Sequence, residues 1–127
     1  MSSKTAVVVL SDPSTGSDEA LGRVFDALAT AWEFAQGDSE ALVLFQGTGT
    51  RWPAVLADPG HPAHELYTAV KEQVATVASS GCTTVFGANK GIEDEGIKQI
   101  GQNQAPGTPG VASIRELVES GYRVLTF

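Results

Sequence analysis

The 127-residue sequence contains a single cysteine, so no disulfide can form within the chain, and nothing in it points to an oxidising compartment. Basic residues are also few: 8 Lys and Arg stand against 15 Asp and Glu, which gives a formal net charge of −7. This balance opposes nucleic-acid binding, which depends on neutralising phosphates. The longest aliphatic run, residues 6–10, is far shorter than the roughly 20 residues that a membrane span needs. We therefore expect a cytoplasmic protein with one domain, residues 1–127, that binds neither membrane nor nucleic acid.

Short apolar runs along the chain predict the strands of a sheet. Residues 6–10 and 41–45 are continuous apolar runs, which are typical of strands covered on both faces in a parallel sheet. Residues 83–86 and 123–127 are shorter and rich in β-branched and aromatic side chains, so they predict two further strands. A brief edge strand is expected within residues 102–107.

Amphipathic segments alternate with these runs and predict helices. Residues 17–37 form the first helix, with Ser17 as its N-cap. Residues 62–81 form the second and residues 108–121 the last, while a shorter helix is expected within residues 91–101. Alternation of this kind predicts an α/β fold in which helices cover both faces of a parallel sheet.

Ligands of open parallel sheets bind beyond the carboxyl ends of the strands. This rule selects four loops for a binding site: residues 11–17, 46–53, 87–91 and 102–107.

The first of these loops combines hydroxyl groups and a glycine directly ahead of a helix, which suits an anion. Asp12 and Thr15 are its candidate binding residues, and the Thr15-Gly16 pair resembles the phosphate loop of flavodoxins. Asp18 and Glu19 lie beside it and would repel a phosphate. The alternative is a turn whose side chains only cap the helix.

The second loop is the most unusual segment of the sequence. Its glycines allow the backbone to approach a ligand, its arginine can hold an anion, and its tryptophan offers a face for stacking. Alternatively, the tryptophan packs against the fold or a neighbouring subunit. The candidate binding residues of this loop are Gly47, Thr48, Gly49, Arg51 and Trp52.

The remaining polar candidates are an amide–lysine pair and two histidines. Asn89 and Lys90 belong to the third loop and can hold an anionic group. His61 and His64 have a spacing that places both on one helix face, but a zinc site needs three or four ligands. We expect solvated histidines, no metal and no cofactor.

Cys82 is the only sulfur nucleophile in the chain. It precedes the predicted strand 83–86, so we expect it at the edge of the sheet opposite the four loops. There it would follow the carboxyl end of a helix, whose dipole disfavours a thiolate. This placement predicts an inert cysteine and leaves Cys82 a weak catalytic candidate.

Four segments together resemble the DsrE/DsrF-like family over nearly the whole chain: residues 4–10, 41–47, 82–88 and 110–124. The resemblance implies a single DsrE-like α/β domain, a three-layer α/β/α sandwich with a mainly parallel five-stranded sheet. It also implies assembly into dimers, trimers or hexamers, and a role with a partner protein in intracellular sulfur relay.

Active members of that family carry a persulfide on a cysteine near the carboxyl end of the third strand. The corresponding residues here, 86–92, include no cysteine. The resemblance therefore implies an oligomeric, non-catalytic subunit or small-ligand binder. Three alternatives stay open: a sulfurtransferase or sulfur carrier that uses Cys82, a flavodoxin-like mononucleotide binder, and an interaction module whose subunit contacts use Trp32, Phe34 and Trp52.

Overall fold

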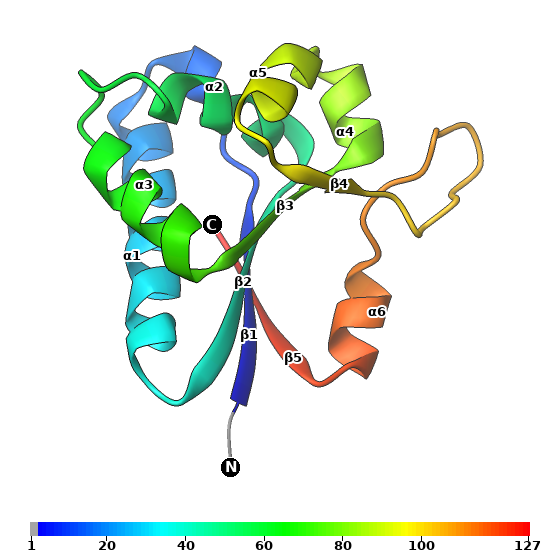
Figure 1. Ribbon diagram of the computed structural model, residues 1–127. Helices are drawn as coiled ribbons and strands as arrows, with labels where there is room; N and C mark the ends of the chain where they lie inside the picture. Colours follow the sequence, from blue (N-terminus) through cyan, green and yellow to red (C-terminus); the bar gives the residue numbers. More distant parts are fainter. Residues whose placement is uncertain (1–2) are drawn as a thin grey trace.

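The computed structural model describes residues 3–127 (Figure 1). Within them lie five strands: β1 (Ser3–Val9), β2 (Ser39–Phe45), β3 (Ala75–Ser79), β4 (Lys98–Ile100) and β5 (Tyr122–Thr126). All neighbouring strands are parallel, in the order β4-β3-β2-β1-β5. The helices are α1 (Asp18–Gln36), α2 (Trp52–Leu56), α3 (His64–Gln73), α4 (Ser80–Val85), α5 (Asn89–Asp94) and α6 (Ile114–Glu119), with short 3-10 helices η1 (Pro13–Thr15) and η2 (Gly47–Arg51).

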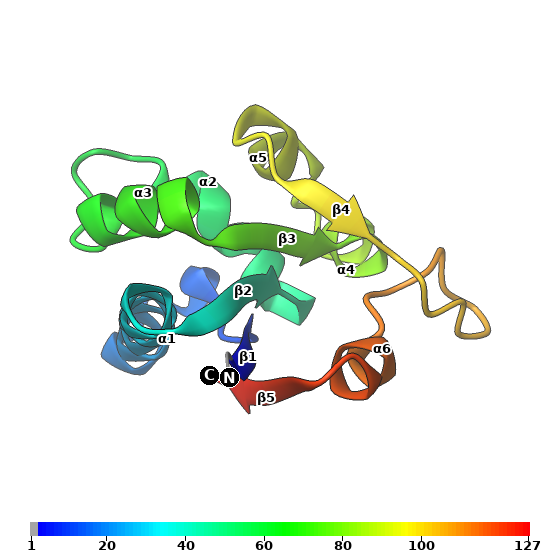
Figure 2. The same cartoon turned by 60° about the horizontal axis from the view of Figure 1, so that its bottom comes forward.

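Helices cover both faces of the sheet, which confirms the predicted α/β sandwich. Figure 2 shows α1 and α3 on one side of the strands and α6 on the other. Alternate residues of a strand point to opposite faces, so β1 contributes Val7 and Val9 to the core under α1 and Val8 to the smaller core under α6. Both cores explain why the central strands are continuous apolar runs.

The first helix forms where its local signals predict it. The Ser17 hydroxyl accepts a hydrogen bond from the Ala20 backbone N–H at 3.1 Å, and Asp18 and Glu19 occupy the first turn. Gly37 follows the last residue of α1. Across residues 3–127, neither this helix nor any other has both the length and the apolar character that crossing a membrane would require.

The third strand is not where the sequence predicted it. Residues 75–79, expected at the end of a long helix, form β3 and pair with β2. Residues 83–86, expected as a strand, lie in and just after α4. The Thr83 hydroxyl donates to the carbonyl of Ser79 at 3.0 Å, so its side chain is satisfied inside the helix. Apolar spacing and β-branched content were both misleading here, because strand pairing overrides local preference.

The carboxyl-terminal third also differs in detail from the prediction. Residues 98–100, expected in a helix, form β4, while residues 102–107 contribute only Asn103, which pairs with Val111 in an isolated antiparallel bridge. The last helix begins at Ile114 and not at residue 108, because Ser113 caps it by accepting from the Glu116 N–H at 3.0 Å.

Candidate functional site

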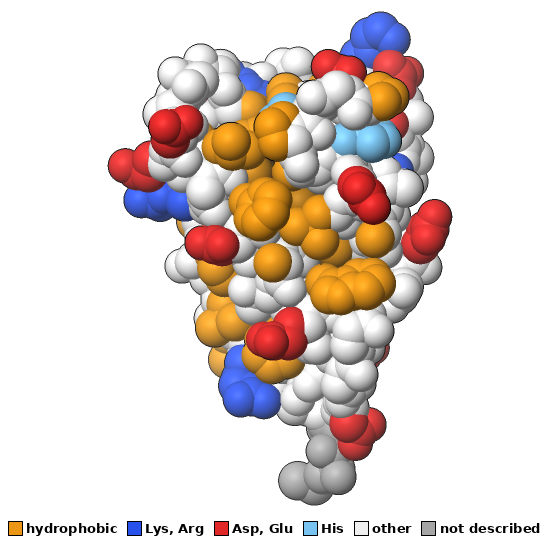
Figure 3. Space-filling view, turned by 90° about the vertical axis from the view of Figure 1, so that its left-hand side faces the viewer, with side chains coloured by type: hydrophobic (Ala, Val, Ile, Leu, Met, Phe, Trp, Pro, Cys, Tyr) orange, Lys and Arg blue, Asp and Glu red, His pale blue; other side chains and the backbone are white. Residues whose placement is uncertain are grey.

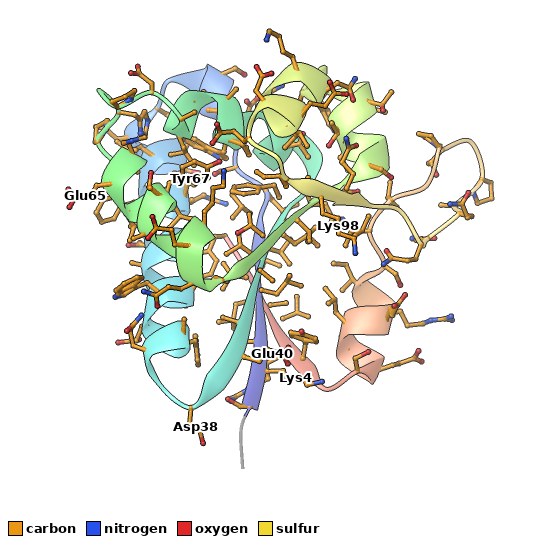
Figure 4. All side chains as sticks on the ribbon, viewed as in Figure 1. Lys4, Asp38, Glu40, Glu65, Tyr67 and Lys98 are labelled. Carbon is orange, nitrogen blue, oxygen red and sulfur yellow. The ribbon has the colours of Figure 1, made fainter. Side chains whose placement is uncertain are left out.

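Four elements that follow strands gather at the carboxyl edge of the sheet. These are η1 after β1, η2 after β2, and α4 and α5 after β3; all lie at the top of the molecule in Figure 1. Lys4 and Glu40 lie at the opposite edge (Figure 4), where their charged groups are 3.9 Å apart. Three of the four loops selected from the sequence therefore meet in space, as the rule for parallel sheets predicts, whereas residues 102–107, which follow β4, are not among these elements.

Arg51 fastens three of these loops together. Its Nη1 lies 3.0 Å from the Asp12 carboxylate and 3.2 Å from the Ser14 hydroxyl. Its Nε donates to the carbonyl of Phe86 at 3.1 Å, and the guanidinium lies 5.5 Å from the centre of the Phe86 ring. Nε and Nη1 of Arg51 thus bind the protein itself, and Arg51 acts mainly as a structural clamp.

The Asp12 carboxylate is stabilised in its charged form. The pKa of Asp12 is lowered chiefly by hydrogen bonds from the Ser14 hydroxyl and backbone N–H, with a further contribution from Arg51. A pKa that is lower in the folded than in the unfolded protein stabilises the fold at neutral pH. That stabilisation is lost as the pH falls below about 3.8 and through the lowered value.

Replacing Asp12 with asparagine is therefore expected to lower the melting temperature at neutral pH. The melting temperature of this variant should also decrease less between neutral and acid pH than that of the wild type. Thermal melts between about pH 3 and about pH 7 measure both effects. Asp26→Asn is the matched control, because Asp26 is exposed on α1 and the chemical change is the same. Identical pH profiles for the two variants would contradict the clamp.

A hollow of about 450 Å³ lies between Arg51 and Lys90. Lys90, however, contacts the Asp94 carboxylate at 2.8 Å, which raises the pKa of Lys90. Asn89 is exposed and does not line this hollow. An incoming anion would have to compete with Asp12 and Asp94 for the two cations, so the hollow is poorly suited to one.

The glycines of the second loop allow close contact between two segments of backbone, η2 and the end of β1, and not between backbone and a ligand. A β-carbon at Gly49 would lie 2.0 Å from the carbonyl oxygen of Val9, so η2 packs directly on the end of β1. The Thr48 hydroxyl donates to the carbonyl of Leu10 at 3.1 Å, and Gly47 has a positive φ of 59°. In the first loop, the Thr15 hydroxyl similarly lies 2.9 Å from that of Ser17, within the turn that leads into α1.

Trp52 is a core residue, so of the two alternatives for this tryptophan it packs against the fold and offers no face for stacking. Its side chain is 3% exposed, and its indole N–H donates to the carbonyl of Ser11 at 2.9 Å. The ring meets His61 edge-on, with 6.1 Å between ring centres.

The two histidines are held by hydrogen bonds to the backbone. His61 Nδ1 accepts from the Ala63 N–H, and His64 Nδ1 donates to the carbonyl of Leu56 at 2.7 Å. Nowhere in residues 3–127 do three or more potential metal ligands cluster.

Cys82 lies at the opposite edge of the sheet from the one predicted. It belongs to α4, directly after the carboxyl end of β3, and so stands among the four gathered elements. The placement was wrong because Cys82 does not precede a strand; it follows one. The thiol is half-buried.

A small hollow of about 100 Å³ adjoins this cysteine. The Gly81 N–H donates to the carbonyl of Gly110 at 2.7 Å, which holds the segment before α6 against α4. Most of the lining is apolar: besides Gly81 and Cys82, the lining residues are Val85, Phe86, Gly107, Thr108, Pro109 and Val111. Phe86 also provides the carbonyl that Arg51 binds, so the thiol hollow adjoins the Arg51 clamp.

A buried tyrosine cluster was missed by sequence reasoning. The Tyr67 hydroxyl on α3 (Figure 4) donates to the Glu95 carboxylate at 2.6 Å, and Lys71 Nζ lies 3.3 Å from the same oxygen. Burial and the neighbouring carboxylate both raise the pKa of Tyr67. The cluster ties α3 to the turn after α5. No spacing in the sequence brings these elements together, since Glu95 lies 28 residues beyond Tyr67.

Comparisons with known proteins identify the fold but no family. No family model matches the sequence, and no curated protein is significantly similar to it. Among solved structures, a conserved protein of unknown function from Bacteroides thetaiotaomicron, BT1422, superposes with a TM-score of 0.58 at 12% identity. The match covers 98% of this chain and 94% of that one. It establishes the fold alone.

Proposed function

We propose that the protein is a sulfur carrier that holds a persulfide on Cys82. The observation that carries this proposal is the position of Cys82 directly after the carboxyl end of β3. The resemblance to the DsrE/DsrF-like family puts the persulfide cysteine near that end of the third strand. The expectation of a non-catalytic subunit depended on the absence of a cysteine from residues 86–92, which were expected to follow the third strand. Because β3 ends at Ser79, the residues that follow it are those of α4, and they include Cys82.

The surroundings of Cys82 suit a bound sulfane sulfur. The adjoining hollow is small and mainly apolar, which favours a polarisable sulfur atom over a hydrated ion. Val85, one turn of helix further on, is 69% exposed, so the hollow opens to the surface. A donor or acceptor protein can thus approach the thiol from outside.

The proposed transfer conserves sulfur and electrons. The Cys82 thiolate attacks the outer sulfur of a donor persulfide, a new S–S bond forms at Cys82, and the S–S bond of the donor breaks. The donor leaves as a thiolate. Delivery repeats the same exchange in the opposite direction, with the thiolate of an acceptor attacking the outer sulfur on Cys82. No external oxidant or reductant is needed.

Loading with a low-molecular-weight persulfide, followed by intact mass measurement, tests the proposal. We expect the protein to gain one sulfur atom, to lose it to an acceptor thiol, and to gain none as Cys82→Ser. The control is the double variant Cys82→Ser with Thr84→Cys, which moves the thiol to an exposed position two residues along α4. Failure of the wild type to load, or equal loading and delivery by the relocated thiol, would contradict a dedicated site.

Self-association in the cytoplasm, with a sulfur-relay protein as partner, belongs to the same proposal. Figure 3 shows apolar side chains gathered on the side of the molecule that carries α1 and α3. Phe25 on α1 is 44% exposed, whereas Trp32 and Phe34 pack partly against the core and are less available for contacts than predicted. An exposed apolar patch of this kind supports an interface between copies of the chain. Sedimentation as a monomer would contradict it.

A further inference from the structure

The hollow beside Cys82 is built from residues that carry no charge. The two longest stretches of the sequence without a charged side chain are residues 73–89 and 99–114. They are separate in the chain, but the structure joins them: the first contains α4, the second contains the segment before α6, and together they supply every residue that lines the hollow. In a chain with a net charge of −7, this sets the surface around the thiol apart.

The second wall of the hollow is an arm, residues 102–110, that projects from the body of the molecule. Figure 1 and Figure 2 both show this segment between β4 and α6 looping away from the sheet. At its base, Asn103 and Val111 exchange two backbone hydrogen bonds, each 2.9 Å long. The Ser80 hydroxyl donates to the Gly110 carbonyl at 3.0 Å, which fixes the arm against the start of α4. Two prolines restrict its backbone further, so the arm presents a preformed surface beside the thiol.

Both walls are accessible from outside. Val85 on α4 is 69% exposed, and Thr108 and Pro109 on the arm are exposed as well. The hollow itself has a volume of only about 100 Å³, which accommodates a sulfur atom and the few atoms next to it. A protein that exchanges sulfur with Cys82 therefore has to rest the residues beside its own cysteine on these walls.

A charged residue beside the incoming cysteine would find no counter-ion there. It would lose part of its hydration against Val85 and the arm, and an unpaired charge pays that cost without compensation. Arg51 does not offer a free charge, because its guanidinium pairs with the Asp12 carboxylate at 3.0 Å and its Nε donates to the carbonyl of Phe86.

We propose that this uncharged surface selects partner proteins whose reactive cysteine is flanked by uncharged side chains. The inference rests on the sulfur-carrier role and deepens it, because it names the chemistry of the protein segment from which Cys82 takes sulfur and to which it delivers sulfur. Selection acts through the cost of desolvating a wrong partner, and it needs no ion pair in the correct complex.

Thiol–disulfide exchange with three peptides tests the surface without any persulfide. In each pentapeptide, with both ends blocked, the central cysteine forms a mixed disulfide with pyridinethiol, and its two neighbours are both serine, both aspartate or both lysine. The Cys82 thiolate attacks the peptide sulfur, a Cys82–peptide disulfide forms, and the pyridinethiolate leaves with the electron pair of the broken S–S bond. Absorbance of the released pyridinethiolate gives each rate, which is divided by the rate of the same peptide with mercaptoethanol, a neutral thiol.

We expect the serine peptide to react with Cys82 about tenfold faster than either charged peptide, because charges of both signs lose hydration at this surface. Attraction by the net charge of −7 alone predicts a different order, with the lysine peptide fastest and the aspartate peptide slowest. That order, equal rates for the three peptides, or no reaction of Cys82 with any of them would overturn the proposal.

Variants of Val85 test whether this surface sets the order. Val85→Glu is expected to make the lysine peptide the fastest of the three, and Val85→Lys the aspartate peptide, because each variant supplies the missing counter-ion. Val118→Glu and Val118→Lys are the matched controls: Val118 is 56% exposed on α6 and does not line the hollow. They change the net charge equally and should keep the wild-type order. A wild-type order in the Val85 variants, or the same change in the Val118 variants, would contradict the proposal.

The two proposals about Cys82 fail separately. A protein that loads no persulfide but prefers the serine peptide refutes the sulfur carrier and keeps the uncharged docking surface. A protein that loads and delivers sulfur but reacts equally with all three peptides keeps the carrier and refutes the selection of partners.

Discussion

Gly49→Ala is expected to prevent stable folding, the largest effect that we anticipate from a single methyl group. The added β-carbon would lie 2.0 Å from the carbonyl oxygen and 2.8 Å from the carbonyl carbon of Val9. Both are backbone atoms at the end of a central strand, so no side chain can rotate away to make room. Moving η2 outward would also strain the Gln46 N–H bond to the same carbonyl, which is 3.0 Å long. We expect a loss of about 3 kcal/mol or more in the free energy of unfolding.

The same substitution at Gly22 provides the control. Gly22 is exposed in α1, and a β-carbon there meets no atom within 4 Å. Because alanine favours the helix, Gly22→Ala is expected to stabilise the protein by about 0.5–1 kcal/mol. Urea denaturation followed by circular dichroism measures both variants. A soluble Gly49→Ala protein with a wild-type midpoint would show that η2 does not rest on β1 as described.

Trp52→Ala is expected to destabilise the protein by about 3–5 kcal/mol, the typical range for a large aromatic side chain removed from a core. Trp52 is buried in the main core, and its indole N–H bonds the loop after β1 through Ser11. Trp52→Phe keeps most of the apolar volume but loses that hydrogen bond, so it should lower the free energy of unfolding less than Trp52→Ala does. Thermal and urea denaturation measure the series.

Trp32 is the matched control for Trp52, because it lies on α1 with its side chain only partly buried against the same core. Trp32→Ala should lower the free energy of unfolding less than Trp52→Ala does, because less apolar surface is removed from the core. Fluorescence gives a second measurement: the emission that remains in Trp32→Phe, from Trp52 alone, should resist quenching by acrylamide. If Trp52 were instead an exposed stacking platform, its emission would be quenched readily and its removal would change stability little.

Local signals were enough to predict several elements. Residues 6–10 and 41–45 predict β1 and β2 because a strand buried on both faces has to be apolar at every position. Residues 17–37 predict α1 because the cap, the acidic first turn and the apolar spacing all agree. The carboxyl-edge rule then selected three loops that gather around Arg51, and a fourth, residues 102–107, that does not.

The roles of side chains within those loops were much less predictable. A glycine that lets a backbone approach a ligand has the same sequence signature as one that lets two backbones touch, and Gly49 is of the second kind. Arg51 was expected to hold an external anion, but Asp12 lies within reach to pair with it. Partners that are 39 residues apart are chosen by the fold and leave no trace in local spacing.

The sequence by itself determined the α/β class, the first two strands, the long first helix and the edge at which loops converge, because each depends on apolar periodicity and capping over a few neighbouring residues. Only the tertiary structure decided which segment became the third strand, since residues 75–79 extend along β2 although their spacing suits a helix. That choice moves Cys82 to the edge where the loops meet, because a residue that follows a parallel strand lies at the opposite end from one that precedes it.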